Sequence, residues 1–187
     1  MKGEDDRRIR KTRAALKQAF INLLSKKDIK EISVRELTEQ ADVNRGTFYL
    51  HYRDVYDFFT HIEGEVLAEF ERFIQTYQNH PPLQLSLLLN LFQYIVENAQ
   101  VFQAILKTGE TKFLDRLIEI CRPPDTAEFE RLYENWTPEH YHYNYDFVAH
   151  GCVAMLRRWL KQGMPETPEY MAELAERMIL SCVENFR

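Results

Sequence analysis

Residues 33–52, SVRELTEQADVNRGTFYLHY, constrain the possible folds of this chain more than any other stretch. Apolar residues recur at helical spacing over residues 34–41, and a second short helical pattern, anchored by Phe48, covers residues 45–50. A tight turn around Asp42 separates the two patterns. Two short helices joined by such a turn are typical of a helix-turn-helix, so we expect this motif here.

Favourable N-cap residues mark the start of both expected helices. Ser33 and Glu36 have the spacing of a capping box, and Asn44 precedes the second helix. Gly46 then lies in a first helical turn, where glycine costs about 1 kcal/mol relative to alanine. This cost is understandable if another backbone, for example a phosphodiester chain, approaches closely there. The alternative is a pair of small core helices with solvated polar residues, which leaves the combination of capping box, glycine and outward polar side chains unexplained.

Polar residues on the outer side of this stretch predict a DNA interface. Their side chains carry the hydrogen-bond donors that phosphates and base edges require. We expect Arg45 and Thr47 to contact bases or nearby phosphates, and most of the other residues to contact the DNA backbone. The complete set of predicted DNA-binding residues is Lys11, Thr12, Ser33, Asn44, Arg45, Gly46, Thr47, Tyr49 and His51.

The same stretch resembles the DNA-binding segment of the TetR/AcrR family of transcriptional regulators, and the resemblance covers roughly residues 8–60. The matching residues are Ser33, Val34, Leu37, Ala41, Val43, Arg45, Gly46, Thr47, Phe48, Tyr49, His51 and Tyr52. The resemblance implies an all-α fold in which a three-helix DNA-binding domain precedes a helical ligand-binding and dimerisation domain. We place the first domain at residues 1–54 and the second at residues 55–187, with a connecting helix over about 54–77.

Two positions depart from the family pattern. Asp42 stands where the family usually has glycine. Aspartate also tolerates a left-handed backbone, so we expect the turn to form. Val55 stands where the family usually has a lysine that holds a phosphate, and Arg53 would replace that contact only in part.

Charge is distributed unequally along the chain. The net charge of −5 by itself argues against a nucleic-acid partner. Residues 1–60, however, hold 13 Lys and Arg against 10 Asp and Glu, whereas the remainder holds 11 against 19. Many of these cations crowd the start of a helix expected over residues 8–24, where they oppose the macrodipole and an external polyanion would relieve the repulsion. The ordinary alternative to DNA contact is that these cations form a solvated basic face. A basic N-terminal part joined to an acidic remainder nevertheless fits a DNA-reading module attached to another domain.

The composition favours a helical intracellular protein. Hydrophobic residues make up 45% and charged residues 28% of the chain, which is ordinary for a globular protein, and we find no alternating strand pattern. Cys121, Cys152 and Cys182 are widely spaced and suggest neither a disulfide framework nor a zinc site. The charged start is unlike a signal peptide, and no apolar run approaches the roughly 20 residues of a membrane span. We therefore expect a cytoplasmic location and no membrane association.

Helical periodicity continues towards the C-terminus, after a boundary signal at residues 78–82. The further helices that we expect cover residues 83–98, about 101–106, 111–121, 137–162 and a last segment from 168, with a turn or two of helix within 125–135.

The last two expected helices are long and amphipathic, which suits an antiparallel pair that meets its copy in a four-helix bundle. Both apolar stripes can alternatively be buried inside one subunit. The family resemblance implies dimerisation through these helices, and residues 147–173 also resemble the short C-terminal domains of Gram-positive-type members. The predicted interface residues are Cys152, Met155, Met171, Leu174, Met178 and Cys182.

The C-terminal part is rich in aromatic residues, which form either an ordinary core or the wall of a ligand pocket. The resemblance implies that some of them line an effector pocket. The candidates are Phe92, Phe102, Phe113, Trp136, Tyr145 and Trp159.

One constellation raises the question of metal chemistry. His142, Asp146 and His150 follow one another at four-residue steps on one helical face, a spacing that can present ligands to a divalent metal. At 1.5 Å per residue the outer two are about 12 Å apart, so at most a neighbouring pair could bind one ion. Because no phosphate-binding glycine loop or nucleophile motif is present either, we predict a non-enzymatic protein without metal or cofactor. A metal-dependent enzyme is the less favoured alternative.

Together these observations predict a homodimeric transcriptional repressor that binds a palindromic DNA operator and is released from it by a small-molecule effector. The main alternative is a DNA-binding regulator or activator that responds to a protein partner.

Overall fold

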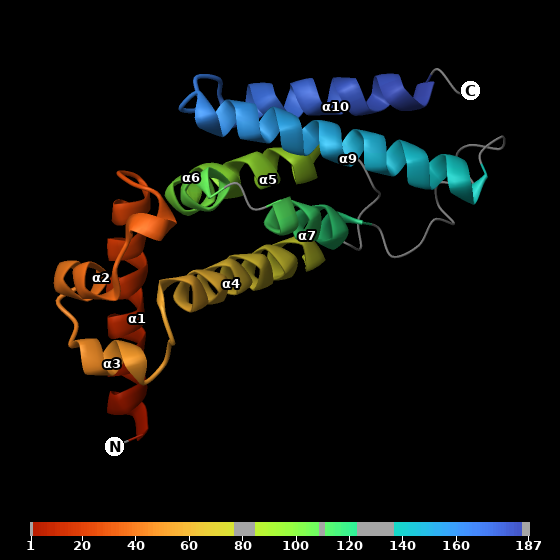
Figure 1. The fold of residues 1–187 in the computed structure, drawn as a ribbon. Helices are drawn as coiled ribbons and strands as arrows, with labels where there is room; N and C mark the ends of the chain where they lie inside the picture. The colour runs from red at the N-terminus through yellow and green to blue at the C-terminus, as the bar shows by residue number, and fades with distance from the viewer. Residues whose placement is uncertain (1, 77–84, 109–110, 123–136, 185–187) are drawn as a thin grey trace. The chain divides into compact units, whose positions relative to one another are not determined.

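The computed structural model describes residues 2–76, 85–108, 111–122 and 137–184, which form helices and contain no β-strand (Figure 1). The all-α class predicted from the sequence is therefore confirmed. None of these helices has the length and apolar character that crossing a bilayer requires. The helices are α1 (Lys2–Leu24), a 3-10 turn (Ile29–Glu31), α2 (Val34–Gln40), α3 (Arg45–Tyr49), α4 (Val55–Gln75), α5 (Leu85–Glu97), α6 (Ala99–Lys107), α7 (Thr111–Cys121), α9 (Pro138–Lys161) and α10 (Pro168–Glu184). The helical segment expected within residues 125–135 lies outside the described residues.

The chain divides into two compact units, which we call the head and the body. The head comprises residues 1–66 and 100–110, and the body comprises residues 67–99 and 111–187. The division falls inside α4, whereas the sequence suggested a boundary at residue 54, before this helix. The helix α6 belongs to the head although it follows α5 of the body along the chain.

An aromatic cluster forms the core of the head and explains why the first half of α4 belongs to it. Phe20 of α1 packs edge-on against Phe58 of α4, with 5.5 Å between the ring centroids. Phe48 of α3 lies 5.8 Å from the same ring, and Tyr52 lies 4.7 Å from it. Such aromatic pairs stabilise beyond the area they bury. Because Phe58 contacts one ring of α1 and two rings in or just after α3, α4 fixes the position of α3 against α1.

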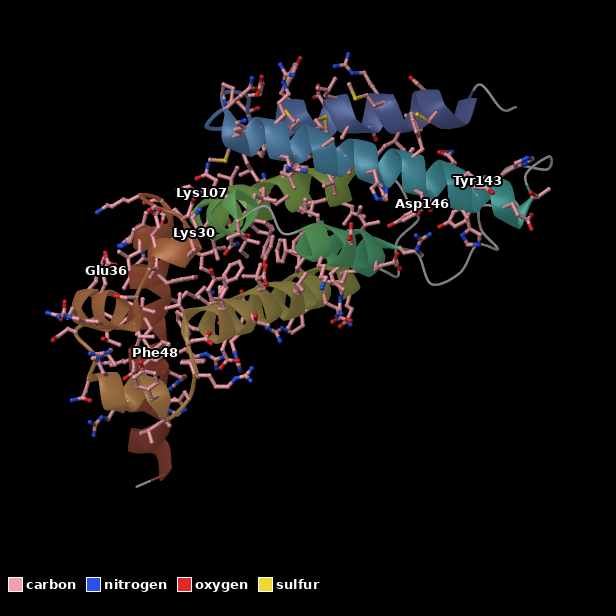
Figure 2. The ribbon with its side chains drawn as sticks, in the orientation of Figure 1. Lys30, Glu36, Phe48, Lys107, Tyr143 and Asp146 are labelled. Carbon is pink, nitrogen blue, oxygen red and sulfur yellow. The ribbon has the colours of Figure 1, made fainter. Side chains whose placement is uncertain are left out.

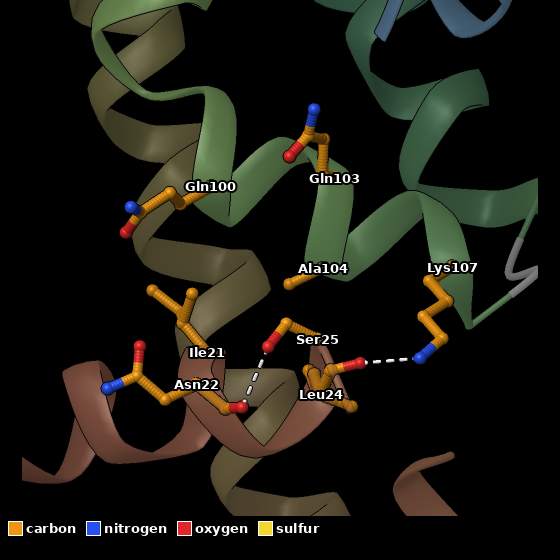
Figure 3. Close-up of a pocket in the computed structure, with 8 residues that line it drawn as sticks. All are labelled: Ile21, Asn22, Leu24, Ser25, Gln100, Gln103, Ala104 and Lys107. Atoms are coloured by element: carbon orange, nitrogen blue, oxygen red, sulfur yellow. Dashed lines mark hydrogen bonds between the residues drawn. The ribbon is translucent and has the colours of Figure 1, made fainter. Parts of the chain in front are cut away.

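The head also includes a contact between α6 and the last turn of α1 (Figure 3). Lys107 Nζ donates a 2.8 Å hydrogen bond to the carbonyl oxygen of Leu24, at the end of α1. The last carbonyls of a helix have no partner within the helix, so the lysine supplies one. A hollow of about 310 Å³ lies beside this bond, with Ser25 and Gln103 in its lining.

In the body, α10 packs against α5 and α9, and α9 also contacts α7. Phe92 of α5 meets Trp159 of α9 edge-on, with ring centroids 5.5 Å apart. Trp159 is 2% exposed, and its indole N–H donates to the Glu166 carbonyl at 3.2 Å. The buried indole is thus both packed and hydrogen-bonded, which fixes the turn between α9 and α10.

The turn after α9 is a Schellman motif. The amide of Gly163 donates to the Leu160 carbonyl at 3.2 Å, and the amide of Met164 donates to the Trp159 carbonyl at 2.9 Å. Gly163 has φ +82°, a backbone conformation that glycine adopts without strain. The turn allows α10 to run back along α9 (Figure 1).

Candidate nucleic-acid interface

The turn between α2 and α3 is a second Schellman motif. Asp42 follows the last residues of α2 with φ +53°, and its amide donates to the Glu39 carbonyl at 3.3 Å. The amide of Val43 donates to the Thr38 carbonyl at 2.9 Å, which completes the pattern. The expectation that aspartate adopts the left-handed conformation at this position is confirmed. The turn has the shape that a helix-turn-helix needs although it lacks the usual glycine.

The start of α2 carries half of the predicted capping box. Ser33 Oγ accepts a hydrogen bond from the Glu36 amide at 3.2 Å. The Glu36 carboxylate does not complete the box but pairs with Lys27 Nζ. A hydrogen bond to a charged donor is stronger than one to a neutral amide. The Glu36 carboxylate therefore pairs with the lysine rather than with the Ser33 amide. Glu36 therefore links α2 to the segment after α1.

The start of α3 gives Gly46 a role inside the protein. Asn44 caps the helix, because its Oδ1 accepts from the Gly46 amide at 2.7 Å. A Cβ at position 46 would lie 3.0 Å from this Oδ1, which is closer than the cap tolerates without moving. Glycine here thus protects the N-cap, and close approach of a phosphodiester chain stays a prediction.

The residues of and beside α3 are largely exposed, apart from one buried anchor. Phe48, labelled in Figure 2, is fully buried in the core of the head. Arg45, Asn44 and His51 are exposed, Thr47 is half-buried, and the Tyr49 side chain is 52% exposed. Leu50, which we had not singled out from the sequence, is 79% exposed. Because Phe48 and the Asn44 cap fix the helix, these side chains are presented on a rigid element.

The basic residues of α1 fall into two groups. Arg13 forms an ion pair with Glu65 of α4, and Lys17 lies 4.0 Å from the same carboxylate. These two cations therefore hold α1 to α4. Lys11 is exposed further towards the N-terminus, and Thr12 beside it is half-buried. The residues placed to meet an external polyanion are thus those before Arg13, the others being Arg7, Arg8 and Arg10.

Val55, at the position of the family's lysine, and Arg53, its partial replacement, both make contacts within the head. Val55 is 4% exposed and belongs to the core. Arg53 Nη2 lies 3.2 Å from an Asp57 oxygen, and the Arg53 amide donates to the same carboxylate at 2.9 Å. These two hydrogen bonds lower the pKa of Asp57. Because the Arg53 side chain is 87% exposed, its ion pair contributes little to stability, and the arginine can exchange Asp57 for a phosphate.

The predicted pocket residues are distributed over the body and the head. Phe92 and Trp159 are in contact, and Phe113 is buried in the body. Phe102 is buried in the head instead. Trp136 lies outside the described residues.

Tyr145 has partners of its own on α7 and beyond its end. Its hydroxyl donates to the Ile118 carbonyl at 2.8 Å. Arg122 lies 4.3 Å over its ring and also donates to Asp146 Oδ1 at 2.8 Å. Burial raises the pKa of the Tyr145 hydroxyl. This cluster joins α7 to α9 within the body.

The predicted interface residues differ in accessibility. Met178 is 54% exposed on α10, whereas Met171 is 3% exposed and packs inside the body. Tyr143 and Phe147 of α9 are 76% and 72% exposed, and sequence reasoning missed both. Their four-residue spacing was a signal, because it puts two large rings on one helical face. The remaining four candidates, Cys152, Met155, Leu174 and Cys182, are half-buried.

The histidine and aspartate constellation of α9 is engaged in other contacts. Asp146 pairs with Arg122, and His150 Nδ1 lies 2.7 Å from the Asp146 carbonyl oxygen. Within the parts of the chain that are described, no three ligating side chains come close enough to hold a metal ion. The positions of these side chains are explained by helix contacts.

Comparison with known proteins identifies the family of this chain. Residues 85–181, just over half of the chain, match a TetR-type family described as "Transcriptional regulator C-terminal region". The chain belongs to the TetR family of transcriptional regulators. The family that we inferred from residues 33–52 is thus confirmed from the other end of the molecule. TetR-family proteins are DNA-binding transcriptional regulators and not enzymes.

Individual relatives are distant. The chain is 23% identical over 165 residues to the uncharacterised HTH-type transcriptional regulator YxbF of Bacillus subtilis, and the match covers 86% of this chain. It spans 42% of the length of that relative.

Solved structures of similar proteins show the same fold. A TetR transcriptional regulator from Streptococcus agalactiae 2603V has a TM-score of 0.66 at 21% identity, covering 96% of this chain and 99% of the other. The dihydroxyacetone kinase operon activator DhaS has a TM-score of 0.63 at 19% identity, covering 94% and 98%.

Proposed function

We propose that this TetR-family regulator binds a palindromic operator as a homodimer, with α3 of each copy in the major groove. The observation that carries this proposal is the presentation of α3, whose polar residues face outward while Phe48 and the Asn44 cap hold the helix in place. A helix with such support can enter the groove without a further cost of ordering its backbone.

Each exposed group suits a particular part of the DNA. Arg45 has a free planar guanidinium for a base edge or a nearby phosphate, and Thr47 lies beside it. The Tyr49 hydroxyl and the His51 ring are exposed groups that could donate to phosphates, and Lys11 would add a cation from α1. Ser33 and Asn44 use their oxygens as caps, so the Ser33 hydroxyl hydrogen and the Asn44 side-chain amide remain for phosphate oxygens.

Dimerisation would use the exposed side of α9 and α10. Tyr143 and Phe147 on α9 and Met178 on α10 are large apolar side chains that solvent would otherwise surround. A second copy would bury them in a four-helix bundle, as in the family at large. Two heads joined in this way can bind two half-sites of an operator.

A small-molecule effector in the body would favour a state of the dimer that does not fit both half-sites, and so release the operator. This is the repressor form of the proposal. Activation is the second candidate, because DhaS, which has a similar fold, is described as an operon activator. A protein partner in place of the small molecule is the alternative for the regulating signal.

Selection of bound sequences from random duplex DNA tests the proposal directly. The wild-type protein should enrich an inverted repeat. Replacing Arg45 with alanine should then weaken operator binding by about 1 to 3 kcal/mol at fixed salt and relax the preference at one position. Lys30→Ala is the matched control, since Lys30 is an exposed cation at the other end of the head from Phe48 (Figure 2). Equal affinities of the two variants would contradict the assignment of Arg45.

A thermal-shift screen against metabolites, lipophilic cations and cell extract tests the effector. A ligand that binds the folded protein raises its melting temperature by mass action. A stabilising compound that also lowers operator affinity supports the effector-controlled form. Absence of any stabilisation favours regulation by a protein partner.

A further inference from the structure

Leu50 has the most exposed large hydrophobic side chain of the described residues, at 79%. An isolated exposed leucine on a protein surface needs no explanation by itself. This one, however, directly follows α3, the helix that we propose to enter the major groove. Its neighbour Tyr49 is 52% exposed, but Leu50 has no polar atom in its side chain that a phosphate could use.

Helix geometry places Leu50 at the centre of the outward face. The Leu50 amide donates to the Gly46 carbonyl at 3.1 Å, so residue 50 continues the helix one turn after residue 46. At about 100° per residue, both positions lie roughly opposite Phe48, which is buried in the core. Gly46 contributes no side chain to this ridge. Leu50 therefore supplies the exposed side chain on the part of the helix that faces away from Phe48.

The chemistry of the major groove decides what such a side chain can recognise. Base edges there present nitrogen and oxygen donors and acceptors, together with a single apolar group, the C5-methyl group of thymine. A leucine pressed against donors and acceptors would leave them without partners, which is unfavourable. A leucine against a methyl group buries apolar surface on both sides.

We propose that Leu50 contacts a thymine methyl group and thereby imposes a preference for a T·A pair at one position of each operator half-site. This inference rests on the proposed function, since it requires α3 to lie in the major groove. It assigns a base-reading role to an apolar residue that the expected set of polar contacts omits. Arg45 and Thr47 would then position and read neighbouring groups, while Leu50 reads the methyl group.

The first experiment compares sequences selected from random duplex DNA by the wild-type dimer, Leu50→Ala and Val96→Ala. Val96 is an exposed apolar residue of α5 in the body, so its variant controls for a general loss of apolar surface. We expect one strongly preferred thymine per half-site that loses its preference in Leu50→Ala and keeps it in Val96→Ala. Because Leu50 is exposed, its substitution should leave the circular dichroism spectrum and melting temperature unchanged.

The second experiment removes only the methyl group. Each thymine of the selected half-site is replaced in turn by deoxyuridine, and affinity is measured at fixed salt. At one position the wild-type protein should lose affinity about threefold to fivefold, as expected for one buried methyl group. Leu50→Ala should be insensitive to that replacement.

The outcomes separate this inference from the proposed function. If the wild-type protein enriches no sequence, the proposed function fails and the role of Leu50 falls with it. If the wild-type protein enriches an operator but Leu50→Ala retains every base preference, the role of Leu50 is overturned while DNA recognition stands. The same conclusion follows if no deoxyuridine replacement weakens wild-type binding.

Discussion

At the scale of single residues, Asp42 has a left-handed backbone conformation, which is less favourable for aspartate than for glycine. Its φ of +53° costs an L-residue roughly 1 kcal/mol or more, although aspartate tolerates it better than most. Asp42→Gly should therefore raise the free energy of unfolding by up to about 1 kcal/mol, and Asp42→Ala should lower it. Urea denaturation of the purified protein measures both changes.

The control for this prediction lies two residues earlier. Gln40 is the last residue of α2 and has a right-handed helical backbone. Gln40→Gly should lower the free energy of unfolding by about 1 kcal/mol, because glycine gains nothing there and loses more chain entropy. A stabilisation by both glycine substitutions would contradict the backbone explanation.

Cys121 gives a second prediction at this scale. Burial is the main reason that the pKa of its thiol is raised to about 12. The thiolate is the reactive form, so at pH 8 almost none of this residue can react while the protein is folded. Alkylation with iodoacetamide followed by peptide mass spectrometry should show Cys121 protected in buffer and modified in denaturant. Equal rates in both conditions would show that the thiol is accessible.

At the scale of helices, the contact between α6 and α1 has an energetic consequence. Lys107 donates to the Leu24 carbonyl and brings a positive charge to the negative end of the α1 dipole. Lys107→Met keeps the apolar stem and removes both effects, so it should lower the free energy of unfolding by about 0.5 to 1 kcal/mol. Thermal or urea unfolding measures the change.

Lys112→Met is the matched control for that helix contact. Lys112 is an exposed lysine near the start of α7, where a positive charge opposes the helix dipole. Its removal should be neutral or slightly stabilising. A loss of stability as large as that of Lys107→Met would mean that side-chain packing, and not the carbonyl contact, explains both.

Most elements could be predicted because their ends carry local signals. Asn44, Asp54 and Thr137 accept amide hydrogen bonds at helix starts, as their residue types suggested. The partnership of α6 with α1 could not be foreseen, since Lys107 and Leu24 are 83 residues apart in sequence. The contact of Gly46 with its own N-cap could not be foreseen either, because a sequence does not show that the Asn44 oxygen occupies the space beside it.

At the scale of the whole molecule, periodicity identifies an apolar stripe but not which part of the stripe the chain's own helices cover. Met171 and Met178 lie on the same predicted stripe, yet the first is 3% exposed and the second 54%. Tyr143 and Phe147 stand among polar residues of α9 and were overlooked, although they offer the largest exposed rings of that helix. The choice of dimer surface therefore needed the packing of α9 against α7 and α10.

This surface leads to the last prediction. If a second copy covers Phe147, a carboxylate at that position would be buried without a partner, which is strongly unfavourable. Phe147→Glu should raise the dimer dissociation constant about tenfold or more, and analytical ultracentrifugation measures that shift. Tyr56→Glu, an equally drastic change at an exposed ring of α4, should leave the dimer intact. The operator affinity of Phe147→Glu should fall together with the fraction of dimer, because each head alone binds one half-site. A monomeric variant that retains full operator affinity would show that pairing of the heads is not required.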